Sequence, residues 1–444
     1  MGDRSIPSIW DDGSISAPPG QPGGVSFLAA SRLSPHPTPT KILPLGFHRV
    51  HTGVGLNMNV WGLRALGVMA VLGALAAPAW GAQQWGVQPQ AAGLSASGLL
   101  NMSWQRPHFN QTTAGGEGGS ISGDLFLGWG TTSEKVAAHL EWAAGNGICG
   151  LYNGSCTNAD LRTTTQGFQV SEIYWSFLQG ASILEIGMID STRWIDINPL
   201  AGDENRLFMG QPFRLDPTIP HPDYAPGGVI QTTDIGWAVT LLGASSMGLI
   251  DANGDPNAVW DAAGKVGNFF ALSLGSTSPV GTRITYWQDN GHYAAGSGVS
   301  HYNDGNRTHM ARGVSLSAAT GTPETGGGYF VRLGWGDQQQ SRIGKFASLG
   351  VVMPSGAGLM GLGWAGSWLS RGFLDHQAAI PAGEQVNAGA AEHHVEWFYR
   401  VQAGAQSEWT LDLQYLRHPG GDSQPNSPAR RQDWIGGMRL VSLF

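Results

Sequence analysis

The C-terminal segment Glu392–Phe444 constrains the fold most, because its side chains alternate between two unlike faces. Three stretches alternate in this way: 394–402, 409–416 and 433–444. The apolar face of the middle stretch has four residues: Trp409, Leu411, Leu413 and Tyr415. A soluble sandwich would cover such a face with a second sheet. Here aromatic residues stand near the strand ends and Phe444 closes the chain, which is typical of transmembrane barrel strands whose apolar side contacts lipid.

The composition agrees with a wall that contacts lipid on one side. The 444 residues include 67 glycines and 18 tryptophans, and only 13% are charged. A soluble domain usually has about 25% charged residues. The formal net charge of -8 shows no basic signature, so we expect no nucleic-acid partner.

Alternation along the chain predicts an all-β fold, a transmembrane antiparallel β-barrel of about 16 strands with long extracellular loops and short periplasmic turns. Short and long connections alternate as such a barrel requires: Ala403–Glu408 is short, whereas Arg417–Gln432 is long. Between the predicted strands 229–242 and 244–251, Gly243 alone is the predicted turn. The longest connection is Ser191–Gly228, which the alternation of connections places on the extracellular side.

The N-terminal part is not expected in the working protein. Residues 1–57 have no periodicity and form an unstructured extension. Residues 58–81 resemble a signal peptide, with Arg64, the apolar run Ala65–Ala77 and the small-x-small site Ala79-Trp80-Gly81. Residues 82–444 then form the barrel domain. We favour translation from Met58, with an extended signal as the alternative.

No enzyme signature is present: the sequence lacks G-x-S-x-G, a P-loop, H-E-x-x-H and C-x-x-C. We therefore predict no enzyme activity, no cofactor and no metal. His393-His394-x-Glu396 resembles a ligand set, but alternation puts the two histidines on opposite faces. Asp251–Asn257 resembles a calcium loop, yet Pro256 stands where such loops need Gly, so a solvated turn is favoured. Cys149 and Cys156 are a candidate disulfide in an exposed loop.

The candidate substrate-binding residues lie in the predicted lumen. Alternation points wall residues inward, because charge on the lipid face is costly; those chosen are Glu172, Arg332, Glu396, Arg400, Asp412 and Arg439. The long connection adds Arg193, Trp194, Asp196, Asp203, Glu204 and Arg206, and we expect it to fold inward and narrow the channel. Arginine side chains donate hydrogen bonds to neighbouring hydroxyls of a neutral polyol, and carboxylates accept hydrogen bonds from them. An aromatic ring can stack on the C–H face of a sugar. The alternative is a wet lumen whose charges pair with one another. Tryptophans at strand ends are assigned to the interface girdle: Trp129, Trp142, Trp335, Trp409 and Trp434.

Several motifs, in order along the chain, resemble the carbohydrate-selective porins of Gram-negative outer membranes. They are Leu184–Asp190, Trp194–Asn198, Asp203–Asn205 with Phe208, Tyr329–Trp335, Glu396-x-Phe398-Tyr399, Leu411–Tyr415 with His418–Gly421, and Gly437-x-Arg439-Leu440. The resemblance implies a sixteen-stranded barrel that admits glucose and related monosaccharides by facilitated diffusion. The sequence departs from the family in its opening Trp-Gly-rich segment, which is reduced to Trp85-Gly86.

Two other functions remain open: a general diffusion pore for small polar solutes, and an outer-membrane barrel enzyme. The expected partners are small carbohydrate substrates, outer-membrane lipid and the barrel assembly machinery, with a homotrimer as an open alternative. The expected location is the outer membrane, reached through the signal peptide.

Overall fold

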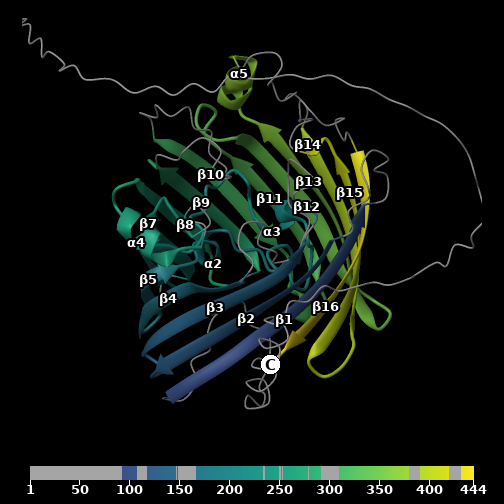
Figure 1. Cartoon of the computed structure of the whole chain (residues 1–444), viewed down its shortest axis with the longest axis horizontal. Coiled ribbons are helices and arrows are strands. Elements are labelled where there is room, and N and C mark those ends of the chain that lie inside the picture. The colour runs from purple at the N-terminus through teal and green to yellow at the C-terminus, as the bar shows by residue number, and fades with distance from the viewer. Residues whose placement is uncertain are drawn as a thin grey trace, which may run out of the picture. The chain divides into compact units, whose positions relative to one another are not determined.

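The computed structural model describes residues 93–107, 118–146, 148, 167–233, 236–249, 252, 254–278, 280–291, 310–379, 391–419 and 432–444. Sixteen antiparallel strands close into a barrel in sequence order, and the last strand pairs with the first (Figure 1). The predicted fold is therefore confirmed. The predicted segments 1–57 and 58–81 lie outside the described residues. Within the described residues, no helix has the length and apolar character needed to cross a bilayer.

The strands follow the alternating segments of the sequence. Their bounds are β1 (Gly93–Pro107), β2 (Gly118–Gly130), β3 (Glu134–Asn146), β4 (Gly167–Gln179), β5 (Ser182–Ile189), β6 (Ala225–Thr232), β7 (Trp237–Ser245), β8 (Asn268–Ser276), β9 (Gly281–Asp289), β10 (Ala311–Ala319), β11 (Gly328–Trp335), β12 (Ile343–Ser355), β13 (Gly358–Leu369), β14 (Glu392–Gln402), β15 (Ser407–Arg417) and β16 (Gln432–Leu443). The connections contain α2 (Thr192–Ile195), α3 (Gln211–Arg214), α4 (Pro256–Ala262), η2 (Pro323–Thr325) and α5 (Arg371–Ala379).

The two faces of the wall are as the alternation predicts. On β15, Leu411 is 52% exposed on the outside, whereas its neighbour Asp412 is 4% exposed on the inside. Four of the predicted girdle tryptophans are exposed near strand ends, which agrees with their assignment: Trp129, Trp335, Trp409 and Trp434. Trp142 is half-buried. A strand with one apolar and one polar face thus gives a barrel with a lipid side and a polar interior.

The predicted boundary between the sixth and seventh strands was wrong. Gly243 lies within β7, and the connection from β6 to β7 runs from Thr233 to Gly236. Gly236 adopts a φ of 76°, a left-handed conformation that favours glycine and suits a tight turn. Gly243 points outward into open space, where no side chain is needed. The shift leaves the number of strands unchanged, because one short turn replaces another.

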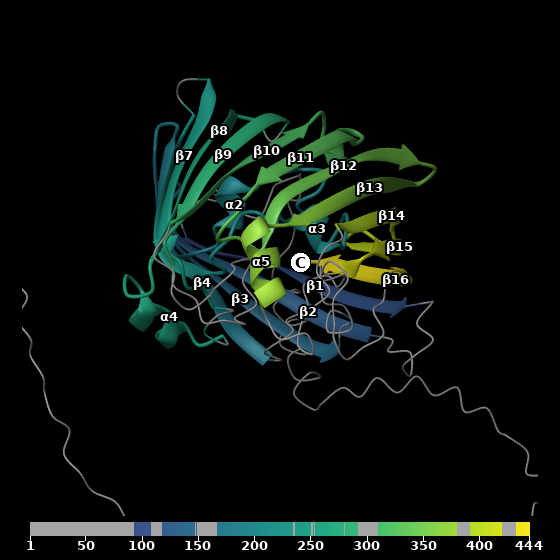
Figure 2. The same ribbon diagram turned by 90° about the horizontal axis from the view of Figure 1, so that it is seen from above.

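The connection between β5 and β6, residues 190–224, lies inside the barrel and is called the inner loop below. Figure 2 shows its helices α2 and α3 within the ring of strands. Most of its apolar side chains are buried against the wall. Phe208 packs on Phe330 of β11 and Phe398 of β14, and Phe213 stacks on Phe208. The barrel interior is therefore a packed interface between wall and loop over much of its area.

Glycines of the wall make room for the inner loop. A Cβ on Gly363 of β13 would lie 2.7 Å from the Phe213 ring and 3.0 Å from the Phe208 ring. A Cβ on Gly334 of β11 would lie 2.4 Å from the carboxylate of Asp216. These positions act as sockets, since any larger residue would push the loop away from the wall.

Candidate functional site

The inner loop enters the barrel through a buried ion cluster. Arg193 of α2 binds Glu172 of β4 at 2.9 Å and Glu185 of β5 at 3.0 Å. Glu172 also accepts a hydrogen bond from the backbone N–H of Asp190 at 2.9 Å. The guanidinium lies 4.9 Å from the ring centroid of Tyr174. These contacts fix the first turn of the loop to the wall, because each carboxylate has a charged partner inside a poorly solvated interior.

A second group closes the base of a lobe formed by residues 197–215. The Asp196 carboxylate accepts the backbone N–H of Asp216 at 2.6 Å and pairs with Arg332 of β11. Arg332 also donates to the Phe213 carbonyl at 2.7 Å. Ser315 of β10 donates to Asp216 at 2.7 Å. The two ends of the lobe therefore meet at one point on the wall.

The pKa values of the two carboxyl groups at this base shift in opposite directions. Burial disfavours the ionised form of Asp196, but Arg332 and then His221 outweigh burial and lower the pKa of Asp196 below its usual range. Burial, and then the nearby charge of Asp196, raise the pKa of Asp216.

The backbone of the lobe is held by charged wall side chains. Arg439 of β16 donates to the carbonyls of Glu204 and Leu207, the latter at 2.8 Å. Glu396 of β14 accepts the backbone N–H of Gly210 at 2.8 Å. On β1, the Asn101 amide donates to Asn205 at 2.5 Å. The lobe consequently reaches across the barrel and contacts both strands of the closing seam.

Seven of the predicted substrate-binding residues are buried in the structure. Arg332, Glu396 and Arg439 are 0% exposed. The others are also buried: Glu172, Trp194, Asp196 and Asp412. Arg332, Glu396 and Arg439 bind the backbone of the lobe, and Trp194 packs in the apolar cluster on α2, β6, β7, β8 and β9. Asp412 accepts a hydrogen bond from Gln414 of the same strand. A role of these residues in sugar binding stays a prediction.

Two ion pairs on the lobe remain partly open to the lumen. Arg206 binds Glu408 of β15 through two hydrogen bonds of 2.8 and 3.0 Å, and its side chain is 27% exposed. Arg214 binds Glu204 at 2.7 Å, with side-chain exposures of 36% and 12%. Arg400 of β14 lies 3.5 Å from Glu408 and donates to the Arg206 carbonyl at 3.1 Å. Each pair offers a fork of N–H donors beside a carboxylate acceptor.

Asp203 supports the lobe from within. Its carboxylate accepts the backbone N–H groups of Asn205 and Arg206, both at 3.0 Å. Burial raises the pKa of Asp203, while the charge of Arg206 acts in the opposite direction. It therefore shapes the turn that presents Arg206 to the lumen.

Glu408 was missed by the sequence analysis, which placed it in the turn Ala403–Glu408. The β15 ladder begins at Ser407, so Glu408 belongs to the strand. Extending the alternation of Trp409 and Thr410 by one residue would have pointed Glu408 inward. Strand ends are where such assignments fail, because turn residues and terminal strand residues have similar composition.

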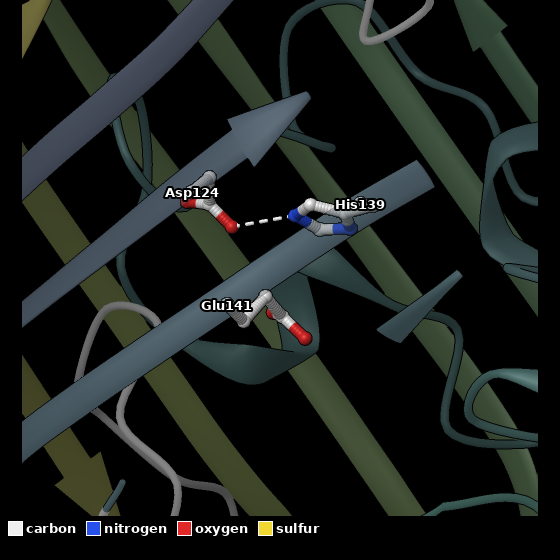
Figure 3. A group of neighbouring side chains, drawn as sticks. All are labelled: Asp124, His139 and Glu141. Atoms are coloured by element: carbon white, nitrogen blue, oxygen red, sulfur yellow. Dashed lines mark hydrogen bonds and ion pairs between the residues drawn. The ribbon is translucent and has the colours of Figure 1, made fainter. Parts of the chain in front are cut away.

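A buried group on the opposite wall ties down the end of the inner loop. Asp124 of β2 and His139 of β3 lie 2.8 Å apart, next to Glu141 (Figure 3). Glu141 accepts hydrogen bonds from Tyr224 and Gln169, both at 3.0 Å. The group could ligate a cation by residue type. Its carboxylates already accept donors, and it serves as a hydrogen-bonded network that holds Tyr224.

The remaining candidates fall in three places. His393 faces outward and stacks on Trp364, while His394 is buried inside, as the alternation predicts. Asp255 caps α4 by accepting the Asn257 backbone N–H at 2.9 Å. Asp251, the first residue of the calcium-like motif Asp251–Asn257, lies outside the described residues. The same holds for the two cysteines, Cys149 and Cys156.

Comparisons with known proteins agree with this architecture. The model of the carbohydrate-selective porin, OprB family, matches residues 253–440, so the resemblance seen in the sequence is confirmed over that range. A structure of OprB from Pseudomonas putida at high pH has a TM-score of 0.61 and 12% identity, covering 79% of this chain and 94% of that chain. A triple mutant of the Rhodopseudomonas blastica porin has a TM-score of 0.41 and 10% identity, covering 79% of this chain and 100% of that chain. No curated protein matches the chain. The barrel and the family match support a carbohydrate porin of a Gram-negative outer membrane, a channel in preference to an enzyme.

Proposed function

We propose that this barrel is a carbohydrate-selective porin that admits monosaccharides such as glucose by facilitated diffusion past the lobe of its inner loop. The observation that carries the proposal is the position of two partly exposed Arg–carboxylate pairs on a loop fixed inside the barrel. Guanidinium donors and carboxylate acceptors together match the vicinal hydroxyls of a sugar. Arg206 and Arg214, with Glu204, Glu408 and Arg400, would form the contact surface.

Such a site has to be weak. Each hydrogen bond to a sugar contributes about 0.5–1.5 kcal/mol net, or up to about 3 kcal/mol with a charged partner. A conduit needs binding that favours entry but permits release. The half-exposed pairs suit this requirement because water competes for the same groups. A general diffusion pore is the second candidate, and it would conduct ions without block by sugars.

Replacing Arg206 by Gln should weaken glucose block about tenfold, since one charge-assisted hydrogen bond is lost. The measurement is single-channel conductance of the purified barrel in a planar bilayer, with glucose titrated as blocker. Arg283→Gln is the matched control: Arg283 lies on the inner face of β9 and donates a hydrogen bond to Ser273 Oγ at 3.2 Å. Unchanged block in Arg206→Gln, or equal weakening in both variants, would contradict the proposed contact surface. The absence of glucose block in the wild type would favour the general pore.

The working protein is proposed to be the barrel from about Ala82, after export by the signal peptide 58–81 and insertion by the barrel assembly machinery. Residues 1–57 have no role in this proposal, and a homotrimer is its proposed assembly. A gene that begins at Met58 should therefore yield the same amount of heat-modifiable barrel as the full gene. N-terminal sequencing of the purified barrel tests the idea, and a sequence from within 1–57 would refute it.

A further inference from the structure

Three cations and three aromatic rings lie side by side along one outer rim of the barrel. The row crosses six consecutive strands, β10 to β15, and its members are Arg312, Trp335, Lys345, Trp368, His393 and Arg417. Trp335 pairs directly with Lys345, Lys345 with Trp368, and His393 with Arg417. Val314, two residues after Arg312, pairs with Trp335. Directly opposed residues share a face and have Cβ atoms about 4.5–5.5 Å apart. The row is therefore continuous.

The row faces outward and lies at the extracellular end. Arg312, Lys345 and Arg417 are exposed, as are Trp335 and Trp368 at 48% and 37%. His393 stacks on Trp364, with ring centroids 5.8 Å apart. Each member stands at or near the strand end opposite to the C-terminal end of β16; one of the connections at this end contains α5, at the top of Figure 1. Short turns mark the other end, which is periplasmic in such barrels.

The three most basic residues of the row have no partner among the described parts of the chain. Among the described residues, Arg312, Lys345 and Arg417 form no ion pair or side-chain hydrogen bond. The outer faces of the described strands carry no carboxylate at this end; Glu134, which is exposed, lies at the periplasmic start of β3. An unpaired cation facing lipid costs about 2–4 kcal/mol at the bilayer midplane and about 0–1 near the interface. These side chains therefore belong at the level of the headgroups.

We infer that this row is a binding site for a phosphorylated, acylated glycolipid of the outer leaflet, of the lipid A type. Arg and Lys pair with phosphate oxygens. The indole faces between them stack on the C–H faces of sugar rings. Below the row, exposed apolar residues of the same strands meet the acyl chains: Val314, Leu349, Leu362 and Leu413. A phosphoglycolipid presents these three chemistries in the same order from water to hydrocarbon. The site is separate from the lumen and independent of sugar passage.

The test is a titration of the delipidated barrel, in detergent, with bis-phosphorylated lipid A, followed by native mass spectrometry. The triple variant Arg312→Gln, Lys345→Gln, Arg417→Gln should bind lipid A about a hundredfold more weakly than the wild type, because each of the three cations contributes to the attraction of an anionic headgroup. A control triple loses the same charge away from the outer rim: Arg283→Gln on the inner face of β9, Lys265→Gln after α4, and Arg371→Gln on α5. It should bind as the wild type does, and the row variant should keep the wild-type conductance.

Three results would overturn the inference: equal loss in both triples, unchanged binding in the row variant, or equal binding of dephosphorylated lipid A. The first would indicate a general charge effect. If the row variant does not fold, Trp335→Leu with Trp368→Leu replaces it. That pair retains every cation and is still expected to weaken lipid A binding, and unchanged binding would count against the site.

Discussion

A barrel whose residues 198–214 are replaced by a short Gly-Ser linker should conduct ions several-fold better and show no block by glucose. The lobe fills the lumen between β1, β11, β14 and β16, and it carries both partly exposed Arg pairs. Its ends meet where Asp216 donates to Asp196 at 2.6 Å, so a short linker can join them. The sixteen paired strands do not include these residues and remain closed.

Some loss of stability is expected, because Phe208 and Phe213 leave their sockets. Burial of one such side chain contributes about 1.5–3 kcal/mol. The measurement is single-channel conductance with glucose as blocker, after heat-modifiable mobility has shown that the barrel is folded. Replacing α5 by the same linker is the control, since α5 lies in an extracellular connection and should affect neither property. If the excised barrel keeps its conductance and its glucose block, the constriction lies elsewhere in the chain.

Arg332→Met should detach the lobe from the wall while the barrel stays closed. Arg332 is 0% exposed and joins Asp196 to the Phe213 carbonyl. Removing one partner of a buried ion pair costs about 3–5 kcal/mol, because the other charge remains buried without compensation. We expect the lobe to detach while the strands stay paired, because the backbone hydrogen bonds between strands are unchanged by the substitution. Trypsin should then cut after Arg206 or Arg214, which are protected in the wild type.

The same experiment has two internal checks. Arg283→Met removes an inward-facing guanidinium of β9 that has no ion pair in the described residues, and its lobe should stay protected. The double variant Asp196→Asn with Arg332→Met removes both charges, so it should be cut more slowly than Arg332→Met alone. Protection of Arg332→Met equal to that of the wild type would show that the ion pair does not hold the lobe.

Sequence alternation predicted the wall well because each strand has one lipid face and one inner face. A one-residue error would have put charges such as Arg439 or Asp412 in lipid, which is too costly to be tolerated. The boundary at Gly243 had no such check. Its neighbours are apolar on both sides, and a glycine in open space looks the same in sequence as a glycine in a turn.

The seating of the inner loop could be predicted only in part. Length and charge indicated that it folds inward, but alternation cannot tell an inner residue that meets water from one that meets the loop. Arg332, Glu396 and Arg439 are inward-facing by pattern and inaccessible in the structure for this reason. The wall sockets at Gly334 and Gly363 depend on residues more than a hundred positions away, which no local pattern records.

The contacts of the lobe with both strands of the seam link the order of assembly to the state of the channel. The lobe comes from the middle of the chain, yet it binds Asn101 of the first strand and Arg439 of the last. Its last contacts cannot form until β16 has arrived, because contacts between distant parts of a chain require the intervening segments to be in place. The barrel wall and the position of the lobe inside it are consequently completed in the same step, so a sheet that has not yet closed also lacks a fully positioned lobe.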